Sequence, residues 1–206
     1  METVEKIGIM GGTFNPIHNG HLMLAQCAYR QFHLDRILVI PNRLPVYKES
    51  KELLAPDLRS EMIRLAIKDY PYMRFSDIEL KRSGPTYSID TIRELHRLYP
   101  NARLYFIIGG DSLTHFMEWR EYSNLLRECA FLCAPRPGAD FQTLYAAREK
   151  LLQEVPEGQI LFLNVAMMDI SSTEIRNAIR EHQSTAEWIP AEVRTYIDEH
   201  QLYSTI

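Results

Sequence analysis

Cysteine is scarce in this sequence, and long apolar runs are missing. The three cysteines, Cys27, Cys129 and Cys133, have neither metal-binding nor redox spacing, and their odd number is typical of a protein in a reducing cytosol. No apolar segment approaches membrane-spanning length, and residues 1–6 lack the basic segment and apolar core of a signal peptide. We therefore expect a cytoplasmic protein without a membrane span.

An excess of positive charge is also lacking. The chain has 23 Lys and Arg against 27 Asp and Glu, a net charge of −4, which argues against a general nucleic-acid-binding surface. Any anionic ligand must then be met by local groups. With 206 residues, 46% hydrophobic and 24% charged, the chain is expected to form a single globular domain over residues 1–206.

Two common phosphate-binding motifs are absent, because the sequence contains neither G-x-x-x-x-G-K-[ST] nor G-x-G-x-x-G. Residues 7–22 contain instead an apolar strand, the pair Gly11 and Gly12, a turn at Asn15-Pro16 and the start of a helix. The glycines let a ligand approach the backbone, and the free N–H groups of a helix N-terminus favour phosphate.

His18 and His21 are three residues apart, so they share one face of that first turn, and Gly20 leaves the face uncluttered. The pattern predicts a phosphate cradle that contains two imidazoles. Two other interpretations are open at this point. The pair could bind zinc, although metalloprotease-type histidines are four residues apart with a Glu between them, and no Cys or Asp cluster accompanies these. The two rings could also simply be satisfied at a helix start.

Apolar periodicity divides the chain into alternating strands and helices. Strands are expected at residues 7–10, 37–40, 73–80, 103–108, 129–134 and 159–165. Helices are expected at 18–32, 57–70 with Asp57 as cap, 88–98, a short passage at 116–126, 141–152, from 170 onward, and 191–200. This alternation predicts an α/β fold: a Rossmann-like open, mainly parallel sheet with helices on both faces and the site at the C-terminal strand ends.

Three further segments carry polar groups suited to a nucleotide. Residues 170–176 form a hydroxyl-rich helix start, capped by Ser171 or Ser172, with Arg176 a turn further in; such groups suit a polyphosphate, although similar caps are common. Residues 107–112 end a strand with glycines and Asp111, which by itself predicts a helix cap. Thr86 and Tyr87 lie just before a helix, so their N–H groups are free to meet an anion.

Residues 11–22, Gly-Gly-Thr-Phe-Asn-Pro-Ile-His-Asn-Gly-His-Leu, resemble the G-G-T-F-[DN]-P-[IP]-H-x-G-H-L signature of the H-x-G-H nucleotidyltransferases. Residues 170–176 are similar to the I-S-S-T-x-I-R motif of its adenylyltransferases, and residues 107–113 to their I-x-G-x-D-x-L motif. With the Gly-Pro-Thr-Tyr segment at 84–87, the resemblance extends over nearly the whole chain and narrows to the bacterial nicotinate-mononucleotide adenylyltransferases.

The resemblance implies transfer of the adenylyl group of ATP to nicotinate mononucleotide, with release of pyrophosphate and no covalent intermediate. His18 and His21 would be catalytic, donating hydrogen bonds to ATP phosphates, and Mg²⁺ would bridge the β- and γ-phosphates without side-chain ligands from the protein. ATP would also contact Gly11, Gly12, Thr13, Phe14, Gly109, Asp111, Ser172, Thr173 and Arg176. The β- and γ-phosphates would lie at Ser172, Thr173 and Arg176. A ribose hydroxyl would donate to Asp111.

For the second substrate, the resemblance implies that Thr86 and Tyr87 bind the nicotinate carboxylate, that Trp119 stacks on the ring and that Lys48 reaches a phosphate. By itself, Trp119 is equally typical of a core aromatic. Family members commonly have P-P-H-K where this chain has Pro45-Val46-Tyr47-Lys48, so Tyr47 replaces a histidine. Arg136 could add positive charge.

Two alternative functions remain from the sequence. One is a non-catalytic nucleotide sensor, which a pyrophosphate-release assay separates from an enzyme. The other is a pantetheine-phosphate or cytidylyl-type transferase on the same fold. Testing a panel of phosphorylated acceptors with ATP would distinguish it from a nicotinate-mononucleotide adenylyltransferase. The sequence leaves open whether the protein is a monomer or a homo-oligomer.

Overall fold

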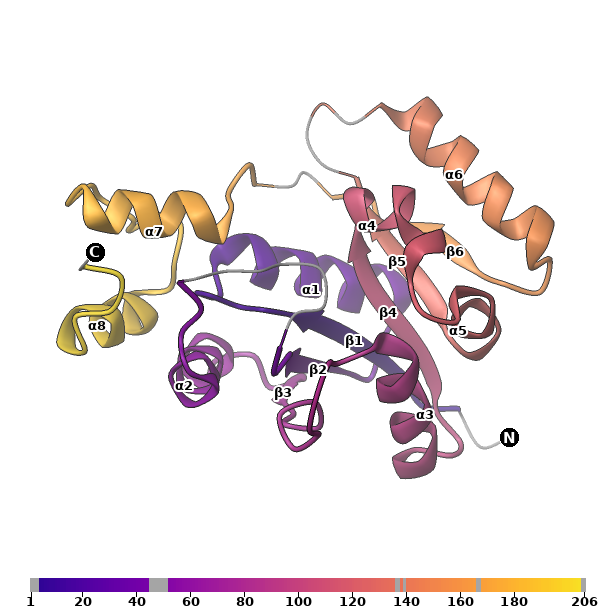
Figure 1. The fold of residues 1–206 in the computed structure, drawn as a ribbon, viewed down its shortest axis with the longest axis horizontal. Coiled ribbons are helices and arrows are strands. Elements are labelled where there is room, and N and C mark those ends of the chain that lie inside the picture. Colours follow the sequence, from indigo (N-terminus) through magenta and orange to yellow (C-terminus); the bar gives the residue numbers. More distant parts are fainter. Residues whose placement is uncertain (1–3, 45–51, 136–137, 139, 166–167, 205–206) are drawn as a thin grey trace.

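The core of the molecule is a six-stranded sheet with helices on both faces (Figure 1). A computed structural model describes residues 4–44, 52–135, 138, 140–165 and 168–204. The strands are β1 Lys6–Gly12, β2 Arg36–Pro41, β3 Met73–Phe75, β4 Arg103–Gly109, β5 Ala130–Ala134 and β6 Ile160–Phe162. They lie in the order β3-β2-β1-β4-β5-β6, and every neighbouring pair is parallel. The predicted Rossmann-like α/β fold is therefore confirmed.

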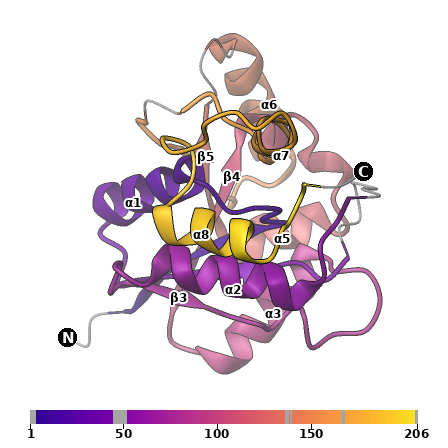
Figure 2. The same cartoon turned by 90° about the vertical axis from the view of Figure 1, so that its left-hand side faces the viewer.

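Each face of the sheet has its own hydrophobic core. One face packs against α1 Asn19–Phe32, α2 Pro56–Ile67, α7 Ser172–Arg180 and α8 Ala191–Glu199; the other packs against α3 Ser88–Leu98, α4 Gly110–Thr114, the 3₁₀ turn η1 Phe116–Glu118, α5 Tyr122–Glu128 and α6 Phe141–Glu154. Figure 2 shows α8 lying along α2. Along β1, Met10 joins the first core while Ile7 and Ile9 join the second, because successive strand residues point to opposite faces.

The chain order of the strands reverses between β1 and β4, which are neighbours in the sheet. The chain leaves β1 at Gly12 and leaves β4 at Gly109, both at the carboxyl edge of the sheet. Open α/β sheets bind ligands outside the strand ends at this kind of reversal. The fold therefore places two of the predicted motifs, residues 11–22 and 107–112, at its expected binding edge.

Several predicted boundaries were wrong. The strand expected at 73–80 ends at Phe75, because residues 77–80 form a turn in which the N–H of Leu80 donates to the carbonyl of Asp77. The strand expected at 159–165 is confined to 160–162, at the sheet edge. The helix expected at 57–70 with Asp57 as cap runs instead from Pro56, whose fixed φ suits a first helical position, to Ile67. Among the residues that the structure describes, no helix is long and apolar enough to cross a membrane.

Candidate active site

Two histidine rings stack at the start of α1. His18 is the N-cap residue, and its ring centroid lies 3.7 Å from that of His21, with 34° between the ring planes. The predicted sharing of one face is confirmed. The backbone N–H of His18 donates to Nδ1 of His21 at 3.2 Å. Since Nδ1 accepts, a neutral His21 ring carries its proton on Nε2, which is then a donor.

His18 is a neutral side chain at physiological pH. The residue is only 6% exposed, and within the described part of the chain its Nδ1 has no hydrogen-bond partner. Burial lowers the pKa of its ring from 6.5 to about 4, against the opposing effect of the Glu174 charge. A Cβ on Gly20 would lie 3.0 Å from this Nδ1, so the glycine between the histidines gives the ring its room. His18 therefore offers a polar ring without positive charge.

The paired glycines at the end of β1 have a packing role in addition to any ligand role. Phe14 adopts the left-handed backbone region, with φ 49°, and is 2% exposed. Its ring lies edge-on to His21, with centroids 5.1 Å apart, and a Cβ on Gly12 would lie 2.9 Å from Phe14 Cζ. A Cβ on Gly11 would approach the Phe106 ring at 3.3 Å. Aromatic rings thus occupy part of the space beside these glycines, and the approach of a ligand to their backbone stays a prediction.

The start of α7 lies against the loop that precedes α1. Ser171 caps α7: its Oγ accepts from the N–H of Glu174 at 3.2 Å, and the Glu174 carboxylate accepts from the N–H of Ser171 at 2.8 Å. The hydroxyl of Ser172 donates to the carbonyl of Pro16 at 2.9 Å. Two helix N-termini are therefore brought together by residues 156 positions apart, and at the start of α1 the N–H of Asn19 already donates to the carbonyl of Trp188 at 2.8 Å.

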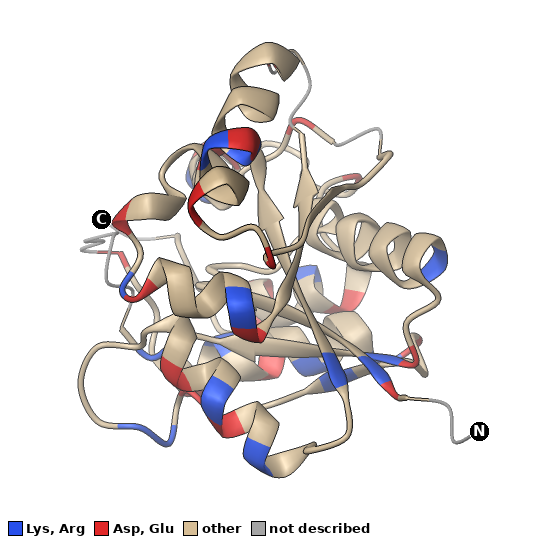
Figure 3. Ribbon diagram, turned by 90° about the vertical axis from the view of Figure 1, so that its right-hand side faces the viewer, with Lys and Arg blue, Asp and Glu red and all other residues tan. Residues whose placement is uncertain are grey.

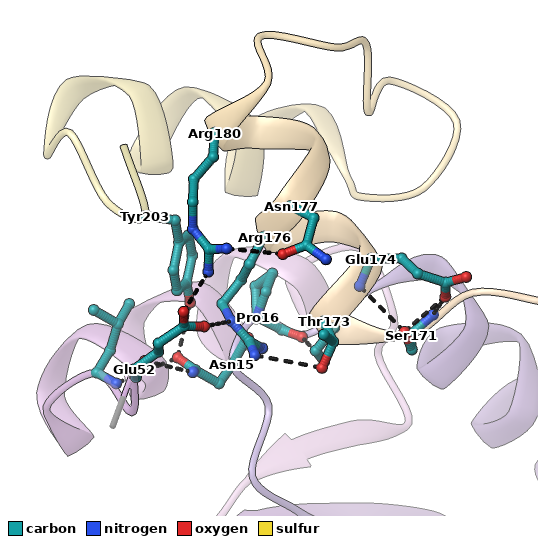
Figure 4. Close-up of polar contacts among 12 residues, drawn as sticks. Asn15, Pro16, Glu52, Ser171, Thr173, Glu174, Arg176, Asn177, Arg180 and Tyr203 are labelled. Carbon is teal, nitrogen blue, oxygen red and sulfur yellow. Dashed lines mark hydrogen bonds and ion pairs between the residues drawn. The ribbon is translucent and has the colours of Figure 1, made fainter. Parts of the chain in front are cut away.

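Arg176 points into the protein. It is 8% exposed; its Nε donates to the Glu52 carboxylate at 3.0 Å, Nη1 to the carbonyl of Asn15 at 2.9 Å, and Nη2 to Thr173 Oγ1 at 3.4 Å (Figure 4). Arg180 lies 2.7 Å from the other carboxylate oxygen, and hydrogen bonding from Arg176 is the largest of the effects that lower the pKa of Glu52. Contact between Arg176 and an outer phosphate would require Glu52 to share or leave the guanidinium.

Three residues of this network, Asn15, Glu52 and Tyr203, were missed by sequence reasoning. The side-chain N–H of Asn15 donates to the carbonyl of Glu52 at 2.9 Å, and the hydroxyl of Tyr203 donates to Asn15 Oδ1 at 2.9 Å (Figure 4). An asparagine before a proline in the signature was a usable signal for the first. No signal pointed to the other two, which lie 37 and 188 positions away.

The end of β4 presents a second part of the site. Gly109 is the N-cap of α4, so the expectation that Asp111 caps this helix was wrong; Asp111 is an exposed residue in the first turn. A Cβ on Gly109 would meet nothing within 4 Å, so the strand end faces open space. The loop therefore has room for a ligand beside its backbone.

The segment before α3 forms a third part. Tyr87 is the N-cap of α3, and in the described part of the chain the N–H groups of Thr86 and Tyr87 have no acceptor. The Arg120 guanidinium lies 4.6 Å from the Tyr87 ring centroid. One face of Trp119 stacks on Phe116, at 5.1 Å and 22°. Tyr87 and Trp119 both pack against the second hydrophobic core, and the hydroxyl of Thr86 donates to the carbonyl of Leu44 at 3.0 Å.

Lys48, Tyr47 and Arg136 lie outside the described residues. Among the residues that are described, no cluster of three or more His, Cys, Asp or Glu side chains could hold a metal ion. Acidic and basic positions are interspersed over the helices in Figure 3, in line with the small net charge. A phosphate at the paired helix starts would thus be met by local N–H groups and side chains.

The chain matches known proteins over nearly its whole length. The cytidylyltransferase-like family model matches residues 9–178. A probable nicotinate-nucleotide adenylyltransferase of Lachnoclostridium phytofermentans is 42% identical over 97% of this chain and 100% of its own, and one of Geotalea daltonii is 39% identical over 97% and 98%. The Plasmodium falciparum nicotinic acid mononucleotide adenylyltransferase, solved in complex with NaAD, shares the fold, with a TM-score of 0.78 and 24% identity over 97% of each chain.

Family membership follows from the extent of these matches together with the paired histidines at the switch point of the sheet. The family model spans most of the sheet and both helix N-termini, and the bacterial relatives cover the C-terminal helices as well. The chain belongs to the cytidylyltransferase-like family and, within it, to the nicotinate-nucleotide adenylyltransferases.

Proposed function

We infer that this protein transfers the adenylyl group of ATP to nicotinate mononucleotide, giving nicotinate adenine dinucleotide and pyrophosphate. The observation that carries this conclusion is the stacked pair His18 and His21 at one helix N-terminus, joined through Ser172 to a second helix N-terminus. The N–H groups at the start of α7 and neutral ring donors suit a triphosphate, whose charge shifts toward pyrophosphate during the reaction. We propose that a single domain carries the whole activity.

ATP is proposed to lie across the strand ends of β1 and β4. Its phosphates meet Gly11, Gly12, Thr13 and Phe14 of the first loop, His18 and His21, and the start of α7 at Ser172, Thr173 and Arg176; its nucleoside meets Gly109 and Asp111. The open space at Gly109 and the Nε2 donor of His21 support this placement. The protein forms no covalent bond to substrate, so its contribution is positioning and stabilisation of developing charge.

Nicotinate mononucleotide is proposed to bind at the segment before α3. Its ring carboxylate accepts from the N–H groups of Thr86 and Tyr87, and its ring stacks on Trp119. The unused N–H groups at the N-cap of α3 support this placement. Lys48 is the proposed partner of the mononucleotide phosphate. The oxygen of that 5′-phosphate attacks the α-phosphorus of ATP in line with the departing pyrophosphate.

An ATP-using nucleotidyltransferase works with a divalent cation, and we propose Mg²⁺. The described residues fit this choice, since they contain no cage of acidic or imidazole ligands and Mg²⁺ is usually held by substrate phosphates and water. When bound, the ion neutralises charge on the β- and γ-phosphates. The cytoplasmic location, and the expectation of no nucleic-acid partner, stay predictions.

The test is a panel of phosphorylated acceptors incubated with ATP and Mg²⁺. Nicotinate mononucleotide, nicotinamide mononucleotide, pantetheine phosphate and a sugar phosphate are compared by pyrophosphate release and by identification of the dinucleotide product. Rapid release with nicotinate mononucleotide is the expected result. ATP binding without release from any acceptor would refute the enzyme and favour a nucleotide sensor.

A further inference from the structure

A buried arginine that the proposed chemistry does not use lies beneath the strand ends. Arg59 of α2 has 0% of its surface exposed and, among the described residues, is the bulkiest fully buried side chain. Its hydrogen bonds go to backbone carbonyls, and no described carboxylate is among their acceptors. Burying a charge without an opposite charge is costly, and an apolar side chain would fill the same volume without that cost. The position therefore requires something that only a guanidinium supplies.

Arg59 holds three chain segments through these carbonyls. Its Nη1 donates to Thr13 at 2.7 Å, its Nη2 donates to Asn42 at 2.9 Å, and its Nε donates to Leu54 at 3.0 Å. Thr13 follows β1, Asn42 follows β2, and Leu54 precedes α2. A planar guanidinium has five N–H donors in a fixed fork, so it can hold three carbonyls that approach from different directions, which a lysine ammonium does less well.

The segment after β2 continues into the wall that is proposed to bind the acceptor. Arg43 donates through its own guanidinium to the carbonyl of Arg82 at 3.1 Å. Thr86 donates through its hydroxyl to the carbonyl of Leu44 at 3.0 Å. The loop of residues 42–44 is thus bonded to Arg59 through the carbonyl of Asn42, and to residues 82–86 through Arg43 and Leu44. Thr13, held by the same guanidinium, belongs to the loop proposed to bind ATP.

We propose that Arg59 is a positioning residue that fixes the ATP loop after β1 relative to the acceptor wall formed by residues 42–44 and 82–86. This inference rests on the proposed function, because it concerns the separation of two substrates in one complex. In-line attack needs reacting atoms roughly 3–3.5 Å apart, and a displacement of about 1 Å can slow such a step about 100-fold. Arg59 touches neither substrate, and acts on the reaction through the carbonyls of Thr13 and Asn42.

The experiment compares Arg59→Lys and Arg59→Met with the unmutated protein. The dissociation constants of ATP and of nicotinate mononucleotide are measured separately, with the other substrate absent, and the transfer rate is measured in a single turnover at saturation. We expect the single-turnover rate to fall about 10- to 100-fold in both variants, while each dissociation constant changes less than about threefold. Arg59→Lys carries the test by itself if Arg59→Met does not fold.

Ile63→Ala is the matched control, since Ile63 is fully buried on the same helix and its apolar side chain cannot hydrogen-bond to either loop. It should lower the melting temperature while leaving the single-turnover rate of the folded protein unchanged.

Wild-type rates in both Arg59 variants, or a decrease in rate that saturating substrate restores, would overturn the proposal. A wild-type rate in Arg59→Lys alone would also overturn it, because charge rather than the fork would then matter. An unmutated protein that releases no pyrophosphate would refute the proposed function instead.

Discussion

Acidification should lower the free energy of unfolding of this protein through His18. The variant His18→Gln should lack the part of that decrease that His18 causes. The ring is buried, and burial lowers its pKa in the folded protein from 6.5 to about 4, only partly opposed by the charge of Glu174. The unfolded chain therefore binds a proton at a pH where the folded protein does not. The free energy of unfolding then falls as the pH drops through the window from the unfolded to the folded pKa.

The size of the effect follows from the two pKa values. A separation of 2.5 pKa units corresponds to about 3 kcal/mol once the pH is below both values, at about 1.4 kcal/mol for each unit. Between about pH 7 and about pH 5, the part lost is about 2 kcal/mol. Glu79 acts in the opposite sense, because burial raises the pKa of its carboxyl group and so favours the folded protein in acid. A comparison with His18→Gln cancels that contribution.

The assay is urea unfolding at the two pH values, followed by the fluorescence of Trp119 and Trp188. Relative to His18→Gln, the unmutated protein should lose about 2 kcal/mol more on acidification. His200→Gln, which replaces an exposed histidine, is the matched control for the substitution itself. Parallel losses in the unmutated protein and His18→Gln would refute the reasoning that burial keeps His18 neutral.

Three further outcomes are expected. His18→Ala should lower kcat by a factor of about 10²–10³ with little change in the dissociation constant of ATP, because a donor aimed at transition-state charge is lost; near-normal turnover would remove His18 from the mechanism. The unmutated enzyme should favour nicotinate over nicotinamide mononucleotide by at least about tenfold in kcat/KM, since two N–H donors suit a carboxylate better than an amide, and Tyr87→Pro should largely abolish the preference; equal kcat/KM values would contradict the proposed carboxylate site. Tyr203→Phe should lower the free energy of unfolding by about 1 kcal/mol in urea by removing its hydrogen bond to Asn15, and an unchanged value would show that this bond contributes nothing.

Several features were determined by the sequence itself, because they depend on neighbours a few residues apart. The alternation of apolar runs with turn residues predicted the parallel α/β sheet, and the spacing of His18 and His21 predicted their shared helix face. The capping box of Ser171 and Glu174 is likewise local, since both residues stand in one helical turn. Boundaries were less well determined where a strand lies at the sheet edge, as at residues 73–80, because pairing with a neighbour decides where such a strand ends.

Only the tertiary structure decided which polar groups are already in use. The sequence presents Ser172 and Arg176 as two phosphate-binding groups. In the folded chain, the hydroxyl of Ser172 already donates to the carbonyl of Pro16, and the guanidinium of Arg176 already donates to the carboxylate of Glu52. Arg59 was not singled out, although an arginine three and four positions before the buried residues Met62 and Ile63 was a signal that it faces inward. Its role depends on carbonyls from two separate strand ends, and a sequence pattern cannot show them because they meet only when the sheet has formed.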